Sequence, residues 1–291
     1  MKIATLFIAA GLAPFALAAG QWGAARVNGT SLYYEVEGTG HPLVMLQGGQ
    51  LDSRMWNEQF HNYSRKYRVI RYDVRGFGRS GPTGAPYAHH DDLYALLQFL
   101  QVPKAYLVGL SLGGRIAVDF ALTHPEMVDA LVLVGPGLSG FSWSQSENAW
   151  AAPLQAAVKA KDSRRAVEEW LKCPYMAPAM ENRKLAPWLR ELALGNSRVW
   201  LQPDTEKVLA PPAAGRLAEV RAPTLVILGT RDVPDIRRIV ERLAAGIRGA
   251  RKVTVDGAGH MVNLERPADF NRAVLGFLGE QDRAATRSAA P

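Results

Sequence analysis

A serine at residue 111 has the local sequence of an activated nucleophile. Residues 109–113 are Gly-Leu-Ser-Leu-Gly, the Gly-x-Ser-x-Gly spacing of a nucleophile elbow, a strained turn that lifts a serine hydroxyl clear of a sheet. An apolar run, 105–108, precedes the motif and helical spacing follows it at 112–121, so a strand, a tight turn and a helix are expected. Because a neutral serine attacks poorly without a base, acyl transfer at Ser111 requires a base and an acid from elsewhere in the chain.

His260 is the candidate base, and an acidic side chain must hold its ring. It is one of six histidines and follows the last apolar run of the chain, in Asp-Gly-Ala-Gly-His at 256–260. Open α/β sheets place their sites at the carboxyl ends of strands. Asp232 follows the preceding apolar run and is the candidate acid, whereas Asp235 is a rival that could instead cap a helix. The chain order Ser, Asp, His is the order that elbow-type hydrolases use.

Short apolar runs alternate with helical patterns along most of the chain, which predicts a mainly parallel, doubly wound α/β sheet with helices on both faces. An Asn-Gly pair at 28–29 predicts a hairpin before the first of these runs. The expected strands are 31–37, 43–46, 69–72, 105–108, 130–134, 224–228 and 252–255, and the expected helices are 91–100, 112–121, 236–245 and 269–278.

The alternation stops between residues 137 and 220, which we interpret as a helical lid inserted into the α/β core. The core would then comprise 19–136 and 221–280, and the small and charged residues 281–291 are expected to form a disordered tail. Five of the seven tryptophans lie in the inserted segment. They could wall an apolar substrate pocket or anchor the lid helices to the core, since tryptophan packs well in either role.

The first residues have the layout of a secretory signal. Lys2 precedes an almost wholly apolar stretch, and Ala-Leu-Ala at 16–18 offers the small residues that a signal peptidase reads. We therefore expect residues 1–18 to be a signal peptide and the protein to be exported from a bacterial cytoplasm, to the periplasm or the medium. The lone cysteine, Cys173, excludes an internal disulfide and a Cys-rich metal site.

The composition excludes several other classes of function. The net charge of +7 is spread over the chain with no basic run, so no nucleic-acid partner is expected. No phosphate-binding glycine motif and no metal-ligand spacing occurs in the sequence, and we predict neither a cofactor nor a metal. Stable membrane insertion after signal cleavage is not expected either, and the oligomeric state is left open.

Over residues 25–280 the sequence resembles the α/β-hydrolase superfamily. Besides the elbow and His260, residues 73–80 (Asp-Val-Arg-Gly-Phe-Gly-Arg-Ser) are similar to a loop typical of the family, and residues 261–267 (Met-Val-Asn-Leu-Glu-Arg-Pro) are similar to its usual sequel to the catalytic histidine. We interpret the Asp73 loop as structural, because its glycines allow tight turns and its aspartate can bond backbone amides. The resemblance implies a catalytic triad of Ser111, Asp232 and His260.

The resemblance also implies an oxyanion hole formed by the backbone N–H groups of Gly49 and Leu112. The family commonly has His-Gly after its third strand, whereas this chain has Gln-Gly-Gly-Gln at 47–50. The hole uses backbone donors, so this departure leaves them in place and affects the hydrogen bonds that hold the loop. Whether Gln47 and Gln50 face the pocket is open at this point. The expected substrate-binding residues are Gln50, Phe141, Trp143, Met176 and Met261.

The complete set of candidate residues predicts a serine hydrolase that cleaves a small carboxylic ester or lactone through an acyl-enzyme on Ser111. Two alternatives use the same triad, a cofactor-free haloperoxidase or perhydrolase and a carbon–carbon bond hydrolase. A third, of another class, is a small-molecule-binding protein of hydrolase type with little turnover. A serine at the elbow argues against the epoxide hydrolases and haloalkane dehalogenases, which resemble this fold but use aspartate there.

Overall fold

A computed structural model describes residues 20–144 and 150–289 of the chain. The expected signal peptide, 1–18, lies outside the described residues. Among those described, no helix is both long and apolar enough to cross a membrane.

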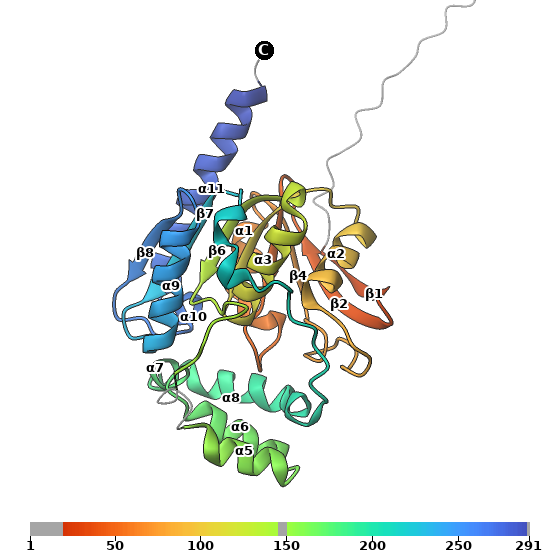
Figure 1. Cartoon of the computed structure of the whole chain (residues 1–291), viewed down its shortest axis with the longest axis vertical. Coiled ribbons are helices and arrows are strands. Elements are labelled where there is room, and N and C mark those ends of the chain that lie inside the picture. Colours follow the sequence, from red (N-terminus) through yellow and green to blue (C-terminus); the bar gives the residue numbers. More distant parts are fainter. Residues whose placement is uncertain (1–19, 145–149, 290–291) are drawn as a thin grey trace, which may run out of the picture.

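The core of the protein is one eight-stranded sheet with the order β1-β2-β4-β3-β5-β6-β7-β8 (Figure 1). The strands from β3 onward pair in parallel, and β2 pairs antiparallel with both β1 and β4. The prediction of a mainly parallel sheet is therefore confirmed. The strands are β1 (Gln21–Val27), β2 (Thr30–Glu37), β3 (Pro42–Leu46), β4 (Arg68–Tyr72), β5 (Ala105–Leu110), β6 (Val128–Val134), β7 (Thr224–Gly229) and β8 (Arg251–Val255).

Helices cover both faces of the sheet, as the apolar runs predicted. One buried cluster joins the sheet to α2 (His89–Phe99), α3 (Leu112–Thr123) and α9 (Pro234–Gly246). A second cluster joins the opposite side chains of the same strands to α1 (Asn57–Tyr63) and α11 (Pro267–Ala289). The central strands are buried on both faces, so their sequences are continuous apolar runs rather than alternating ones.

The last helix corrects the prediction of a disordered tail from residue 281. Helix α11 continues to Ala289 because side chains distant in sequence hold it. The hydroxyls of Tyr67 and Tyr106 each donate to the Asp282 carboxylate at 2.9 Å, and Lys66 forms an ion pair with the same group at 2.6 Å. The segment that we expected to be disordered is therefore helical, and Asp282 ties its start to Tyr106 of β5 and to the residues that precede β4.

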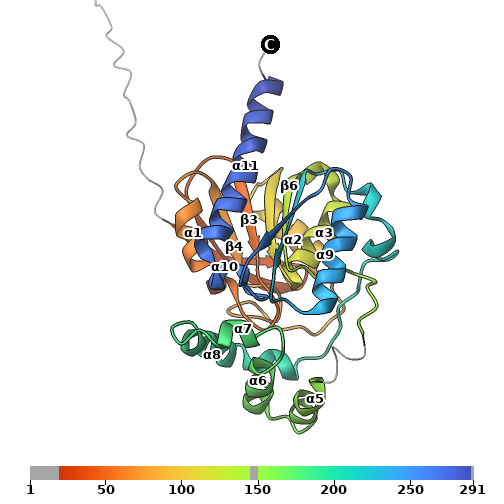
Figure 2. The ribbon, with the colours of Figure 1, turned by 90° about the vertical axis from the view of Figure 1, so that its left-hand side faces the viewer.

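Between β6 and β7 the chain leaves the sheet and forms a helical insertion. It comprises α5 (Ala151–Lys159), α6 (Ser163–Leu171), α7 (Ala177–Met180), α8 (Ala186–Gly195) and the 3-10 turn η3 (Ser197–Leu201). Figures 1 and 2 show these helices grouped below the sheet, at the end of the molecule opposite the C-terminus. Short helical turns occupy the remaining connections: η1 (Ser53–Trp56), η2 (Pro125–Met127), η4 (Ala213–Gly215), η5 (Leu217–Glu219) and α10 (Val262–Glu265).

Close packing of α3 against the sheet positions the turn at residue 111. A Cβ atom on Gly113 would collide with the carbonyl oxygen of Leu46 at the end of β3, and one on Gly109 would collide with the Gly113 carbonyl. Both collisions are with backbone, which cannot move without disturbing the sheet. The two glycines of the motif therefore allow the helix to begin directly against the strand ends.

We predict that Gly113→Ala lowers the free energy of unfolding by about 1–3 kcal/mol, because the added methyl group must displace backbone in a packed core. Gly276→Ala is the matched control. Gly276 lies inside α11 with open space around its Cβ position, so alanine there should stabilise the protein by about 0.5–1 kcal/mol. Urea denaturation measures both changes, and equal effects at the two positions would contradict the packing argument.

Candidate active site

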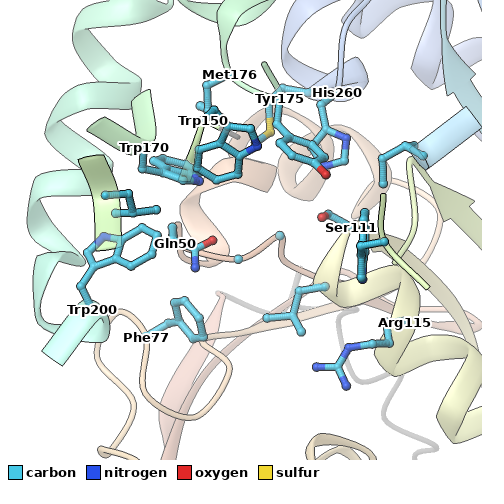
Figure 3. Close-up of a pocket in the computed structure, with 17 residues that line it drawn as sticks. Gln50, Phe77, Ser111, Arg115, Trp150, Trp170, Tyr175, Met176, Trp200 and His260 are labelled. Atoms are coloured by element: carbon cyan, nitrogen blue, oxygen red, sulfur yellow. The ribbon is translucent and has the colours of Figure 1, made fainter. Parts of the chain in front are cut away.

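Ser111 occupies a strained turn whose backbone is fixed on both sides. Its φ angle is +52°, a conformation that non-glycine residues rarely adopt. The Ser111 N–H donates to the carbonyl of Val134 at the end of β6 (3.0 Å), while its own carbonyl accepts from Arg115 (3.0 Å) and Gly137 (2.9 Å). Strained backbone persists where surrounding structure determines it, and here the neighbouring strand end does so. The side chain lies on the wall of a cavity (Figure 3).

His260 and Asp232 form a buried pair at the ends of β8 and β7. The His260 Nδ1 atom lies 3.0 and 3.1 Å from the two carboxylate oxygens of Asp232, and both side chains are almost fully buried. The Val233 N–H donates to Asp232 Oδ1 at 2.8 Å, which fixes the carboxylate. Figure 3 shows the His260 ring and Ser111 at the same end of the cavity. The fold therefore brings together three residues that are separated by up to 149 positions.

Asp235, the rival acid, has a different partner. Its carboxylate accepts hydrogen bonds from the backbone N–H (2.9 Å) and the hydroxyl (3.0 Å) of Ser144, and it pairs with Arg238 one turn along α9. Ser144 belongs to the segment that leads from β6 into the helical insertion. Asp235 thus holds that segment against α9, and the geometry leaves Asp232 as the partner of His260.

Glu265 holds the backbone on either side of His260, a role that we did not predict. One carboxylate oxygen accepts from the Gly259 N–H at 2.7 Å and the other from the Met261 N–H at 3.0 Å. Burial raises the pKa of this carboxyl above its usual range, against the lowering effect of these two hydrogen bonds. The sequence could have indicated this role, because Glu265 lies in the segment after His260 that resembles the one following the catalytic histidine in the family.

Gly49 and Leu112 line the cavity beside Ser111, as an oxyanion hole would require. Leu112 is the first residue of α3, and the N–H groups of the first helical turn have no partner within their helix. The positive end of the helix dipole also favours negative charge at this point. The Leu112 N–H is therefore suited to stabilise a developing oxyanion, and Gly49 lies on the same cavity wall.

Gln47 replaces the family's usual histidine and holds the loop before Gly49. It is fully buried, its Nε2 donates to the Leu51 carbonyl at 2.6 Å, and its Oε1 accepts from the Val74 N–H at 3.3 Å. The glutamine thus ties the loop after β3 to the loop after β4. Gln50, by contrast, lies on the cavity wall (Figure 3).

Asp73 has the structural role that its loop suggested. Its carboxylate accepts from the Ser53 N–H (3.0 Å), the Ser53 hydroxyl (2.5 Å) and the Arg79 N–H (2.7 Å). Burial raises the pKa of this carboxyl, and the hydrogen bonds oppose that rise. Its two oxygens are thus engaged by donors from the segments that follow β3 and β4.

The cavity has a volume of about 410 Å³ and a mainly apolar and aromatic wall, within the size range of small-molecule sites. Four of the expected substrate-binding residues line it, namely Gln50, Trp143, Met176 and Met261. The side chains that the insertion and its flanks contribute are Trp143, Trp150, Leu154, Trp170, Tyr175, Met176 and Trp200. Four of the five inserted tryptophans therefore line the cavity, and the fifth, Trp188, packs against the buried cluster that also contains Trp170.

Phe141 corrects our prediction for the pocket, since it is not among the described residues that line the cavity. Its ring packs against the core cluster beneath α2, α3 and α9 and meets the ring of Trp143 edge-on, with 5.4 Å between ring centroids. It therefore supports a wall residue and does not itself form the wall.

Arg115 also lines the cavity, which the sequence argument missed. It lies one helical turn after Ser111, and its Nη1 and Nη2 atoms each donate to a carboxylate oxygen of Glu206 at 2.8 Å.

Among the described residues, no group of three or more His, Cys, Asp or Glu side chains is placed to hold a metal ion.

Comparison with known proteins places this architecture in a family. Residues 43–273 match the model of the alpha/beta hydrolase family. The chain is 30% identical over 265 residues to "Putative carbamate hydrolase RutD" of Rhizobium rhizogenes, covering 85% of this chain and 97% of that protein. It is also 30% identical over 267 residues to a 2-hydroxy-6-oxononadienedioate/2-hydroxy-6-oxononatrienedioate hydrolase of Burkholderia vietnamiensis, covering 86% of this chain and 92% of that protein.

A solved structure agrees with these matches. The enol-lactonase of Burkholderia xenovorans LB400 superimposes with a TM-score of 0.73 at 26% identity, covering 88% of this chain and all of that one. The family match spans most of the chain, from β3 to α11, and includes the elbow, Asp232 and His260. The chain belongs to the alpha/beta hydrolase family.

Proposed function

We propose that this protein is a serine hydrolase that cleaves small carboxylic esters or lactones through an acyl-enzyme on Ser111. The observation that carries the proposal is the buried Asp232–His260 pair at the same end of the cavity as the strained serine. A nucleophile, a base and an orienting acid are the minimum set for this chemistry. The enol-lactonase to which the chain is similar supports a lactone or ester substrate.

In the proposed reaction the Ser111 oxygen attacks the carbonyl carbon while His260 takes the hydroxyl proton. Asp232 keeps the Nδ1 proton of His260 pointed at itself and stabilises the imidazolium that forms. The carbonyl oxygen becomes an oxyanion between the N–H groups of Gly49 and Leu112. His260 then gives its proton to the leaving alkoxide, which departs as the alcohol. A water molecule, deprotonated by His260, attacks the acyl-enzyme, and collapse of the second tetrahedral intermediate releases the acid and returns the proton to Ser111.

The wall of the cavity favours substrates with an uncharged, apolar or aromatic group next to the ester. Tryptophan, tyrosine and methionine side chains dominate the part contributed by the insertion, and such surfaces bind apolar groups by removing them from water. A substrate of this kind would place its carbonyl at Ser111 and its apolar group among Trp150, Trp170 and Trp200.

The similarity to the Burkholderia vietnamiensis enzyme raises carbon–carbon bond hydrolysis as a second candidate. The named substrate of that relative is a dioate and therefore carries two carboxylates. Binding a carboxylate in an apolar cavity requires an available cation, and Arg115 already donates two hydrogen bonds to Glu206. The cavity thus favours neutral esters or lactones over a dicarboxylate.

Ser111→Ala is the central test of the proposed function. It should lower kcat/KM for 4-nitrophenyl acetate by roughly 10⁴-fold or more, because the acyl-enzyme cannot form and only oxyanion stabilisation and binding remain. A fluorophosphonate probe should label the wild-type protein at residue 111 and leave the variant unlabelled. Undiminished hydrolysis by the variant would sink the proposal, and a wild type that the probe does not label would favour a protein that only binds its ligand.

Substitution of the two neighbouring aspartates tests which one serves His260. Asp232→Asn should lower kcat by roughly 10³–10⁴-fold, because a neutral amide neither fixes the tautomer nor stabilises the imidazolium. Asp235→Asn is the matched control and should retain kcat within about threefold, since it leaves the His260 pair intact and changes at most a fraction of the barrier. Ester hydrolysis by purified variants provides the measurement, and the opposite ranking would assign the acid to Asp235.

Glu265→Gln tests the positioning of His260. A glutamine has one acceptor oxygen and an NH₂ group, so it cannot accept from both the Gly259 and the Met261 N–H as the carboxylate does. We expect kcat to fall on the order of tenfold to a hundredfold with a much smaller change in KM, because the imidazole shifts while the cavity stays formed. Glu280→Gln, at an exposed position on α11, should change neither constant. An unchanged kcat in Glu265→Gln would remove this role.

A further inference from the structure

The carboxylate of Glu206 pairs with Arg115, the one arginine among the described residues that line the cavity. We infer that Glu206 is a specificity-determining residue. By neutralising Arg115, it prevents the cavity from binding esters that carry a carboxylate. This inference rests on the proposed ester hydrolysis and adds the charge class of the substrate. Among the described lining residues, Arg115 is the side chain that bears a permanent positive charge.

Arg115 is placed where it would meet a substrate. Its backbone N–H donates to the Ser111 carbonyl at 3.0 Å, so Arg115 lies in the first turn of α3, directly after Ser111. Figure 3 shows Arg115 below Ser111, at the side of the cavity away from Trp150 and Trp170. An ester bound at Ser111 with an acidic group on its other end could reach this guanidinium. The position of the cation is thus suitable for recognising a carboxylate.

Glu206 binds the Arg115 guanidinium in the same geometry that a substrate carboxylate would need. Two parallel N–H···O bonds of 2.8 Å join the guanidinium fork to both oxygens of Glu206, the strongest arrangement for this pair. Glu206 is itself fixed, because its strand-like segment pairs with Tyr87, where Lys207 N–H donates to the Tyr87 carbonyl at 2.7 Å. Both members of the pair are only 17% exposed. An incoming carboxylate would have to displace an internal, pre-organised one.

The other ionisable groups near Arg115 and Glu206 do not change the charge balance between these two side chains. Asp119 Oδ2 lies 4.0 Å from Arg115 Nη1, beyond hydrogen-bond distance, and accepts instead from the Ser139 hydroxyl at 2.6 Å, whereas Glu206 accepts two hydrogen bonds from the Arg115 guanidinium at 2.8 Å. His89 lies 3.8 Å from Glu206, and burial lowers its pKa to about 3, so its ring is neutral near pH 7. Glu206 is therefore the group whose charge compensates Arg115.

Removing the compensating charge should admit acidic substrates. We expect wild-type protein to hydrolyse dimethyl adipate with a higher kcat/KM than monomethyl adipate, whose second carboxyl is ionised. In Glu206→Gln the ratio of monomethyl to dimethyl kcat/KM should rise by roughly tenfold or more, since Arg115 becomes available as a partner. The double variant Arg115→Gln/Glu206→Gln should lose this gain. Glu241→Gln, an exposed position that pairs with Lys252, removes the same charge elsewhere and should leave the ratio at its wild-type value.

Binding of two probes gives a readout without turnover. Tryptophan fluorescence, sensitive to the indoles of the cavity wall, follows titration with 3-phenylpropanamide and with 3-phenylpropanoate, which differ mainly in charge. Wild-type protein should bind the amide more tightly, and Glu206→Gln should bind the carboxylate more tightly. An unchanged preference in folded Glu206→Gln, or tighter binding of the carboxylate by the wild type, would overturn the inference. If instead Ser111→Ala retains full ester hydrolysis, the proposed function fails while the probe preference still decides the role of Glu206.

Discussion

The contact between the start of α3 and the strand ends is the constraint on which the rest of the site depends. Gly109 and Gly113 bring helix backbone against β3 and β5 without side chains between them, and the Val134 carbonyl holds Ser111 in its strained conformation. One turn of chain thereby places the serine, the Leu112 N–H and, one turn later, the Arg115 guanidinium. The proposed nucleophile, the proposed oxyanion donor and the cation that we infer to act in charge selection are consequently positioned by the same packing contact.

Buried and half-buried carboxylates near the site are divided among separate tasks by their partners. Asp232 is paired with His260, Asp235 with Ser144, Glu265 with two backbone amides, and Asp73 with the loop that follows β4. Burying a carboxylate costs free energy unless hydrogen bonds or an opposite charge compensate it. Each acid is therefore committed to one geometry, which explains why two aspartates only three residues apart cannot exchange roles.

Local patterns in the sequence were sufficient to predict the sheet, the elbow and the strand ends that carry Asp232 and His260. They are short-range signals, because an apolar run or a glycine spacing reflects its immediate backbone. Three other features depend on partners elsewhere in the chain. Asp232 is paired with His260 over a separation of 28 residues, Gln47 accepts from Val74 over 27 residues, and Asp282 in the last helix accepts from Tyr67 over 215 residues. Arg115 and Glu206 are 91 residues apart, and no periodicity in either segment indicates that they meet.

Two segments connect the helical insertion to the sheet, and both are held by side chains near Ser111 or Asp232. Ser144 is held by Asp235 at one end, and at the other Glu206 is held by Arg115 while Gln202 donates to the Gly76 carbonyl and accepts from Thr83. The insertion supplies the aromatic wall of the cavity, whereas the elbow and the Asp232–His260 pair belong to the sheet. In the proposed ester hydrolysis, the insertion would therefore select substrates by the shape of their apolar group, and the Arg115–Glu206 pair would select them by charge.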